Sequence, residues 1–244
     1  MKKVAAGSAN PARRLERWFA GHRRDLPWRR RRDLYAIWIS EVMLQQTRVD
    51  TVLPYYRDFL ERFPSLARLA AAPLHDVLKA WEGLGYYSRA RNLHRAARLV
   101  MDEFHGRIPA EYGRFRELPG VGDYIAAAVM SIGCGLAVPV VDGNVLRVVC
   151  RWQGITGDIR RPDTRDEVRT FLQRIIPPAT PGKFNEAMME LGALICTPQN
   201  PACSTCPVRS CCQAFLEGAP MLYPFRAAAT GGTGPECPAG PTGP

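Results

Sequence analysis

Four cysteines near the end of the chain have the spacing of a metal centre. Cys196, Cys203, Cys206 and Cys212 follow the pattern C-x6-C-x2-C-x5-C, in which only the middle pair forms the short hook that zinc ribbons use twice. The spacing therefore favours a [4Fe–4S] cluster, which four thiolates hold. Disulfide pairs are the alternative, and the adjacent Cys211 leaves the choice of the fourth ligand open at this point.

Two acidic residues lie in settings that suit acid–base chemistry. Glu41 is flanked by large apolar residues in the segment WISEVMLQQT, residues 38–47. If it is buried, desolvation disfavours its charged form and makes it a general acid at neutral pH, whereas a glutamate pointing to water is the alternative. Asp142 precedes an amphipathic segment, where it is either a helix N-cap or a chemical group held in place by the neighbouring Asn144.

Two glycine-rich turns are suited to contact with a phosphate backbone. In LPGVG, residues 118–122, Gly120 and Gly122 flank one apolar residue just before an apolar helix that begins near Tyr124. Backbone N–H groups at that helix start can approach a DNA phosphate, although any turn between helices could use these residues. The second turn, EGLGYYSRAR at 82–91, combines glycines, tyrosines and cations and suits a loop wedged into a distorted duplex, with a turn built on core tyrosines as the alternative.

The segments that must position these residues have helical periodicity. Apolar residues recur at helical spacing in nearly every segment and no strand alternation is present, so the sequence predicts an all-α fold of about ten short helices separated by Pro and Gly. Ile125 to Val141 is predicted to be a buried helix followed by a loop. Arg29 to Arg32 is interpreted as a solvated basic patch. Residues 228–244, rich in Gly and Pro, are predicted to be a disordered tail.

Composition points to a partner with negative charge. The chain has 244 residues with 33 Lys and Arg against 23 Asp and Glu, a formal net charge of +10, which favours nucleic acid ahead of membrane. The longest apolar stretch is interrupted by Ser, Gly and Pro, so no membrane span is expected. The N-terminal Met1-Lys2-Lys3 is not followed by an apolar segment, and a cytoplasmic location is expected.

Several segments, taken in order, resemble a known family. They are SEVMLQQT, WEGLGYYSRARNLHRAA, LPGVGDY, VVDGNVLRV, FNEAMMELGALIC and the four-cysteine loop. Together they are similar to adenine DNA glycosylases of the MutY type, in the helix-hairpin-helix superfamily that includes endonuclease III, over about Leu15 to Phe215. The resemblance implies two helical lobes with DNA between them, in a catalytic region at 1–227. It places a six-helix barrel at about 34–140 and an iron–sulfur lobe at about 12–33 plus 141–215.

The resemblance also implies an activity, which is base-excision repair by hydrolysis of the N-glycosidic bond of adenine mispaired with 8-oxoguanine or guanine. Glu41 would protonate the flipped adenine at N7. Asp142 would stabilise the oxocarbenium-like sugar, with Asn144 orienting that site. Tyr124 stands where lyase relatives carry a Schiff-base lysine, so the enzyme is expected to be monofunctional.

Further positions match family residues that contact DNA or the cofactor. Gln46 and Tyr86 would enter the base stack. The adenine pocket would include Arg24, Trp28 and Glu186. Gly120 and Gly122 would form the hairpin. The x5 spacing of the family selects Cys212 as the fourth ligand of the [4Fe–4S] cluster. The implied partner is double-stranded DNA with an A:8-oxoguanine or A:G mismatch, bound by a monomer associated with the nucleoid of a bacterial cell.

Two departures and three alternatives accompany this resemblance. Asp123 puts a negative charge in the hairpin, and a Pro/Gly-rich tail stands where full-length bacterial members continue into a Nudix-like domain that reads 8-oxoguanine. Weaker phosphate contact and weaker discrimination of the opposite base are therefore expected. The first alternative is an endonuclease III-type lyase, against which Tyr124 argues. The second is a thymine-mismatch glycosylase, which can also carry Tyr at that position. The third is a non-catalytic iron–sulfur DNA-binding protein, against which Glu41 and Asp142 argue.

Overall fold

All regular structure in the described residues of the computed structural model, 10–31 and 33–227, is helical, so the prediction of an all-α fold is confirmed. The α-helices are α1 (Pro11–His22), α2 (Pro27–Arg30), α3 (Leu34–Leu44), α4 (Val49–Arg62), α5 (Leu66–Ala71), α6 (Leu74–Ala80), α7 (Ser88–Glu103), α8 (Tyr112–Arg116), α9 (Asp123–Cys134), α10 (Gly143–Gln153), α11 (Pro162–Ile175), α12 (Pro181–Leu194) and α13 (Gln213–Leu216). Three short 3₁₀ turns are η1 (Cys203–Thr205), η2 (Arg209–Cys211) and η3 (Pro220–Leu222). The tail predicted at 228–244 lies outside the described residues.

Capping residues in the sequence fix where the helices around the site begin and end. Asp33 accepts a hydrogen bond from the Ala36 N–H and so caps α3, while Asp142 does the same for α10. Helices α9 and α10 both end at a glycine with positive φ, Gly135 at 71° and Gly154 at 68°, where a side chain would be strained.

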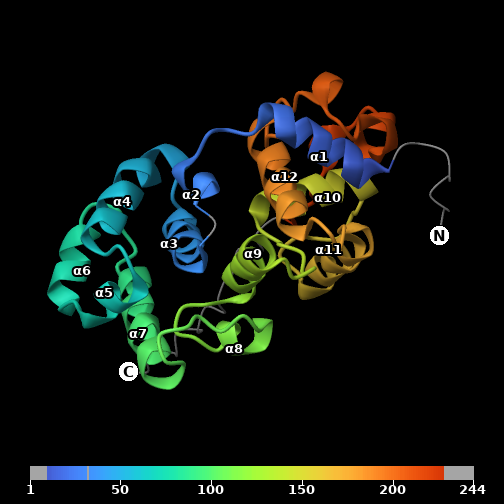
Figure 1. Cartoon of the computed structure of the whole chain (residues 1–244). Coiled ribbons are helices and arrows are strands. Elements are labelled where there is room, and N and C mark those ends of the chain that lie inside the picture. The colour runs from blue at the N-terminus through green and yellow to red at the C-terminus, as the bar shows by residue number, and fades with distance from the viewer. Residues whose placement is uncertain (1–9, 32, 228–244) are drawn as a thin grey trace, which may run out of the picture.

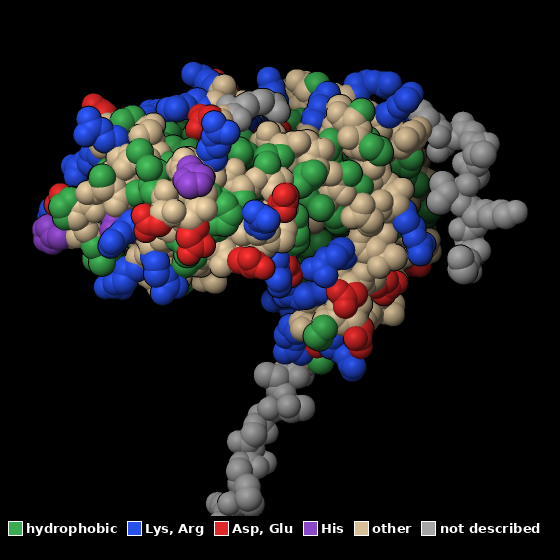
Figure 2. Space-filling model, turned by 60° about the horizontal axis from the view of Figure 1, so that its bottom comes forward, with side chains coloured by type: hydrophobic (Ala, Val, Ile, Leu, Met, Phe, Trp, Pro, Cys, Tyr) green, Lys and Arg blue, Asp and Glu red, His purple; other side chains and the backbone are tan. Residues whose placement is uncertain are grey.

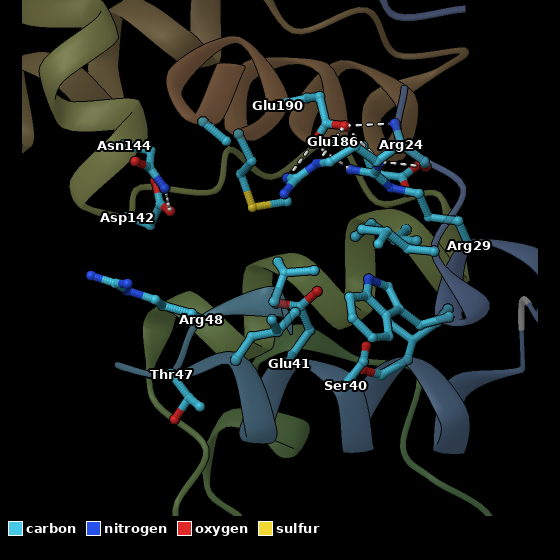
Figure 3. Close-up of a pocket in the computed structure, with 18 of the residues that line it drawn as sticks. Arg24, Arg29, Ser40, Glu41, Thr47, Arg48, Asp142, Asn144, Glu186 and Glu190 are labelled. Atoms are coloured by element: carbon cyan, nitrogen blue, oxygen red, sulfur yellow. Dashed lines mark hydrogen bonds and ion pairs between the residues drawn. The ribbon is translucent and has the colours of Figure 1, made fainter. Parts of the chain in front are cut away.

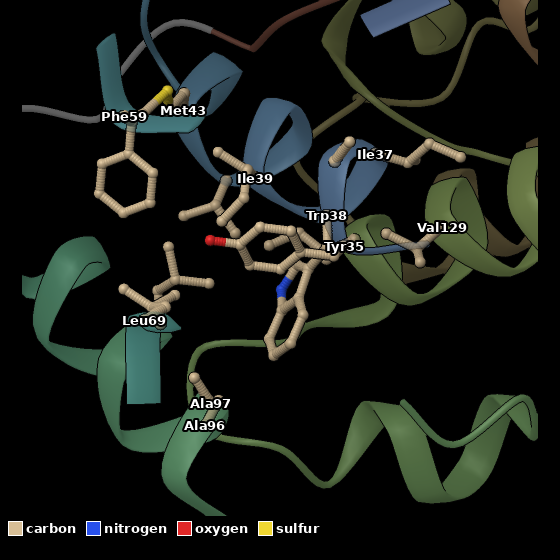
Figure 4. Close-up of a cluster of buried hydrophobic side chains, with 14 of the residues drawn as sticks. Tyr35, Ile37, Trp38, Ile39, Met43, Phe59, Leu69, Ala96, Ala97 and Val129 are labelled. Atoms are coloured by element: carbon tan, nitrogen blue, oxygen red, sulfur yellow. The ribbon is translucent and has the colours of Figure 1, made fainter. Parts of the chain in front are cut away.

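The buried side chains form two large clusters. The first is built mainly by α3 to α9, and it surrounds α3, in which every residue from Tyr35 to Met43 is buried. Figure 4 shows side chains of α3, among them Trp38 and Ile39, together with residues from later helices such as Phe59 and Leu69. Because α3 is buried all round, a polar residue within it must find its partners inside the protein.

The second cluster joins the start of the chain to its later helices. Leu15 and Phe19 of α1 are buried with residues of α10, α11 and α12, such as Val149 and Phe184. Figure 1 shows this arrangement, with α1 lying beside α12 and away from α4 to α6, which the chain reaches after α2 and α3. The chain therefore crosses between the two groups of helices before α2 and again near α9.

Helix α9 lies against both groups. It packs on α3 and on α12, and a Cβ atom on Gly182 of α12 would come within 2.7 Å of the Ser131 carbonyl oxygen. Only glycine permits this approach of α12 to α9, which also contacts α3. None of the helices within the described ranges is long and apolar enough to cross a membrane.

Candidate active site

A cavity of about 460 Å³ lies where α3, α9, α12 and the start of α10 meet, closed on one side by the segment between α1 and α3. Figure 3 shows Glu41 and Ser40 rising from α3, and Asp142, Asn144, Glu186 and Glu190 facing them from the other group of helices. The predicted site residues that line this cavity are Arg24, Trp28, Glu41, Tyr124, Asp142, Asn144 and Glu186. Residues separated by up to 162 positions in the sequence are thus brought to one space.

Glu41 has the environment of a general acid. It is 5% exposed, and the Tyr124 hydroxyl donates a 2.5 Å hydrogen bond to its Oε2. Burial raises the pKa of Glu41 to about 7; the hydrogen bond from Tyr124 opposes this shift, while the negative charges of Glu186 and Asp142 add to it. A substantial fraction of Glu41 therefore carries a proton at neutral pH and can give it up inside the cavity.

Asp142 is both an N-cap and a wall of the cavity. Its Oδ1 accepts a 2.6 Å hydrogen bond from the Val145 N–H at the start of α10, and its Oδ2 accepts one of 3.3 Å from the Asn144 amide. Burial raises the pKa of Asp142, and these two hydrogen bonds oppose the shift. The two interpretations of this residue from the sequence are therefore compatible, because the capping contact leaves the carboxylate on the cavity surface.

Arg147 fixes the orientation of Asn144, and the sequence did not single it out. Its Nη2 donates to Asn144 Oδ1 at 2.9 Å and to the Gly192 carbonyl at 2.8 Å, while its Nε donates to the Cys196 carbonyl at 2.7 Å. The Asn144 amide nitrogen is thereby left to face Asp142. One arginine thus connects the first cysteine of the four-cysteine loop to the carboxylate in the cavity.

Arg29 and Glu190 form an ion-pair network that the sequence interpretation missed. Glu190 is fully buried and accepts hydrogen bonds from Arg29 at 3.0 Å and from the Arg24 guanidinium at 2.7 Å. Burial alone would raise the pKa of Glu190, but the hydrogen bonds from Arg24 and Arg29 outweigh it and hold the pKa at about 2. The Nε of Arg29 also lies 3.5 Å from Glu186.

The interpretation of 29–32 as a solvated patch is therefore wrong for Arg29, whose side chain is 10% exposed. The residues next to Arg29 in the sequence do not indicate that its partner is a buried carboxylate 161 residues further along the chain. The sequence does contain one usable signal, because Glu186 and Glu190 are four residues apart and so share one face of a largely apolar helix.

A second, more open cavity of about 800 Å³ adjoins the first and shares Asp142 and Tyr124 with it. It brings together Gln46 and Tyr86, which the sequence predicts as residues that enter a base stack. Both have positive φ, 55° for Gln46 and 49° for Tyr86, and Tyr86 is 59% exposed. Two residues 40 positions apart therefore project from tight turns on the rim of the same cavity.

Arg89 holds these two turns together. Its buried guanidinium donates to the carbonyls of Met43 and Gln45 at 2.7 Å and to that of Gly85 at 3.2 Å, and its centre lies 5.3 Å from the Tyr86 ring. These N–H donors satisfy backbone carbonyls at the end of α3 and in the turn before α7, where helical hydrogen bonds are not available. The positions of Gln46 and Tyr86 relative to each other therefore depend on one side chain.

The hairpin before α9 is closely packed on its inner side. Gly120 has φ of 79°, and a Cβ there would lie 2.7 Å from Asn92 Cβ. Asp123 follows it, and its carboxylate accepts a hydrogen bond from Arg116 and lies 3.7 Å from Arg169. These cations reduce the repulsion of a phosphate that the sequence led us to expect from Asp123. Figure 2 shows Lys and Arg distributed over the face that it presents, with Asp and Glu interspersed, so basic charge is not confined to the hairpin.

The four predicted cysteine ligands line one narrow pocket, beside Arg151 and Phe215. Cys211 is not among the residues that line it; its thiol instead donates to the Val208 carbonyl at 3.3 Å and lies 3.6 Å from the Arg14 guanidinium. Burial raises the pKa of Cys206 to about 12. In the described part of the chain, no three His, Cys, Asp or Glu side chains are placed to hold a single metal ion.

A family model and curated sequences match this chain. The model described as HhH-GPD superfamily base excision DNA repair protein matches residues 39–178. An adenine DNA glycosylase of Homo sapiens is 48% identical over 206 residues, which make up 81% of this chain and 38% of that protein. One of Buchnera aphidicola is 38% identical over 204 residues, 84% of this chain and 59% of that protein. The chain thus spans less than two thirds of the length of these relatives.

Solved structures match the chain over most of their own length. A thermostable thymine-DNA glycosylase has a TM-score of 0.77 and 28% sequence identity, over 84% of this chain and 95% of that one. Endonuclease III trapped in a covalent intermediate with DNA has a TM-score of 0.71 and 24% identity, over 85% of this chain and 94% of that one. The second likeness concerns the fold alone.

Proposed function

Because the chain belongs to the HhH-GPD superfamily of base excision DNA repair proteins, we propose that it is an adenine DNA glycosylase. It hydrolyses the N-glycosidic bond of adenine mispaired with 8-oxoguanine or guanine in double-stranded DNA. The observation that carries the proposal is a buried carboxyl group with a pKa of about 7, Glu41, in the same cavity as a second carboxylate, Asp142. The names of the curated relatives favour adenine as the base.

The chemistry of the reaction requires this pair. An N-glycosidic bond breaks readily when the base leaves as a neutral molecule and the sugar cation that forms meets a negative charge. Glu41 supplies the proton to adenine N7. Asp142 supplies the charge, and Asn144 holds its carboxylate in place. Sugar hydrolases use two carboxyl groups for the same division of work.

The cavity is large enough for an extruded base. Its volume of about 460 Å³ lies within the range of about 300–1,000 Å³ that small-ligand pockets have. Trp28 provides an aromatic wall of the pocket, and Glu186 accepts a hydrogen bond from the amino group of adenine. Arg24 acts through its ion pair with Glu190, which keeps this side of the pocket in place. Since Glu41 and Asp142 are inside the protein, the adenosine must leave the DNA stack to reach them.

The second cavity and the hairpin hold the DNA from which the base is extruded. Gln46 and Tyr86 enter the stack, where they occupy the space that the adenine leaves. Gly120 and Gly122 bring backbone N–H groups at the start of α9 to a phosphate. The two groups of helices correspond to the six-helix barrel, at about 34–140, and to the lobe formed by about 12–33 and 141–215, with DNA between them.

A [4Fe–4S] cluster fits the donor set of the cysteine pocket. Cys196, Cys203, Cys206 and Cys212 line this one pocket, and four cysteine thiolates are the donor set that such a cluster takes. When bound, the cluster would act as a cross-link, through which the four cysteines would tie the loop that follows α12 to α13. Arg151 of α10 donates hydrogen bonds to the Thr197 and Pro198 carbonyls of that loop.

Single-turnover excision tests the proposal and separates it from its main rival. The purified protein is incubated with duplexes that carry A:8-oxoguanine, A:G or T:G pairs, followed by base treatment to reveal abasic sites. We expect cleavage of the first two duplexes and little of the third. Release of thymine alone would favour the activity for which the structural relative of 28% identity is named. Borohydride should trap little covalent complex, because Tyr124 offers no amine.

A further inference from the structure

Arg48 lines both cavities, and its side chain makes no hydrogen bond or ion pair with any described residue. Four other arginines at this site are engaged within the protein: Arg24 and Arg29 bind Glu190, whereas Arg89 and Arg147 bind backbone carbonyls. A fifth, Arg226, lines only the second cavity, so among the described arginines Arg48 is the one that borders both. An exposed guanidinium next to a carboxylate-lined cavity, with its donors unused, is available to a ligand of negative charge.

The position of Arg48 is the passage between the two cavities. Asp142 and Tyr124 line this passage as well, since both cavities include them. Figure 3 shows the Arg48 side chain extending away from Glu41 into the gap between Asp142 and Thr47. A nucleotide whose base lies beside Glu41 and whose sugar lies beside Asp142 has a phosphate on each side of that sugar, and this gap is next to Asp142 and open to one of them.

The carboxylate of Asp142 creates a need for this cation. The proposed reaction keeps Asp142 ionised close to the sugar, and the same charge repels the phosphates attached to that sugar. A positive group on the opposite wall of the passage offsets this repulsion without neutralising Asp142 by direct pairing. Arginine suits the task because its planar guanidinium binds two phosphate oxygens at once.

We propose that Arg48 binds a backbone phosphate that flanks the extruded adenosine and so holds the glycosidic bond between Glu41 and Asp142. This inference rests on the proposed glycosylase function. In this proposal Arg48 binds the phosphate of the extruded nucleotide and does not contact the base. It therefore contributes to substrate binding and not to the choice of base.

Neutral phosphate substitution tests the contact directly. Duplexes with A opposite 8-oxoguanine are made with a methylphosphonate on the 5′ side or on the 3′ side of the target adenosine. Binding is measured in the Glu41→Gln background, with Arg48→Gln as the test variant. The matched control is Arg62→Gln, which removes the same charge from an exposed site at the far end of α4.

With Arg48 present, and in the Arg62→Gln control, we expect one of the two methylphosphonates to weaken binding about tenfold, the size of one charge-assisted hydrogen bond. In Arg48→Gln that same substitution should have no further effect, and the slope of log K against log salt should fall by about one. Equal sensitivity of Arg48→Gln and the control to both methylphosphonates would overturn the proposal, as would equal affinity of all three proteins for the unmodified duplex.

Failure of this contact and failure of the proposed function give different results. Excision by the protein with Glu41 intact reports on the function alone, because it needs no change at Arg48. If that protein releases adenine but Arg48→Gln is as sensitive to both methylphosphonates as the control, only the role of Arg48 is rejected. Absence of adenine release from every mismatched duplex rejects the glycosylase assignment and this inference with it. Circular dichroism of Arg48→Gln confirms that the variant is folded.

Discussion

The Tyr124 hydroxyl lies 2.5 Å from Glu41 Oε2, which joins α9, the helix that follows the hairpin, to the acid buried in α3. Burial raises the pKa of Tyr124 well above its usual value, so the phenol stays protonated and remains the donor. A donor directed at Glu41 favours its charged form and so limits the rise in its pKa. Tyr124 therefore sets how acidic Glu41 is, in addition to lining the cavity.

We expect Glu41→Gln to abolish adenine excision while leaving the affinity for mismatched DNA largely unchanged, because it removes the proton donor without changing its shape. In the unmodified enzyme, the excision rate should fall as pH rises through about 7, the pKa of Glu41, since only the protonated form is active. Single-turnover rates from pH 5.5 to 9 measure this. Excision by Glu41→Gln at the rate of the unmodified enzyme would contradict the assigned role.

Tyr124→Phe removes the hydrogen bond to Glu41, so the pKa of Glu41 should rise further. The alkaline limb of the pH–rate profile should then move to higher pH, with a smaller maximal rate because the carboxylate left after proton transfer loses a donor. Comparing the two profiles tests the relationship between the residues. An unchanged alkaline limb would show that the hydroxyl does not influence the acid.

The variant Asp142→Asn should be inactive and yet folded. Asparagine caps a helix about as well as aspartate, so α10 should keep its start, but the sugar cation loses its counter-charge. A fall in rate of at least about a hundredfold is expected for the loss of such electrostatic stabilisation. Asp33→Asn, which changes the cap of α3 outside the cavity, is the control and should retain activity and melting temperature.

Serine at Cys196, Cys203, Cys206 or Cys212 should lower the iron content and the yield of folded protein, whereas Cys211→Ser should not. The reason is that the Cys211 thiol points to Val208 and Arg14 and does not line the pocket of the other four. Iron and sulfide analysis of the five purified variants decides the matter. Stoichiometric zinc without sulfide would mean that the pocket holds a different metal centre.

Arg147→Met should lower the excision rate about tenfold or more while the iron content stays near that of the unmodified protein. The substitution leaves the Asn144 oxygen without its donor, so the amide can turn and its contact with Asp142 is lost. Arg165→Met, at an exposed position of α11, is the matched control. Parallel loss of iron and activity in Arg147→Met would indicate a structural effect on the cysteine loop instead.

The sequence predicted the helical fold and brought Glu41 and Asp142 to attention, because apolar periodicity and an acid in an apolar segment are local signals. It could not predict that Arg29 is buried, since the partner that pulls this side chain inward, Glu190, is 161 positions away. Arg147 was missed for the same reason. Its acceptors are an asparagine three residues earlier and two backbone carbonyls on a different helix and loop, which no residue type reveals.

The pairing of α1 with α12 has a consequence for how the chain folds during synthesis. About 160 residues separate the end of α1 from the start of α12, which at roughly 5–20 residues per second takes on the order of ten seconds to translate. During that interval Leu15 and Phe19 lack their partners on α12, while the helices of the first cluster can already assemble. The nascent protein therefore leaves the apolar face of α1 uncovered by α12 for most of its synthesis, and the second group of helices is complete only after α12 has left the ribosome.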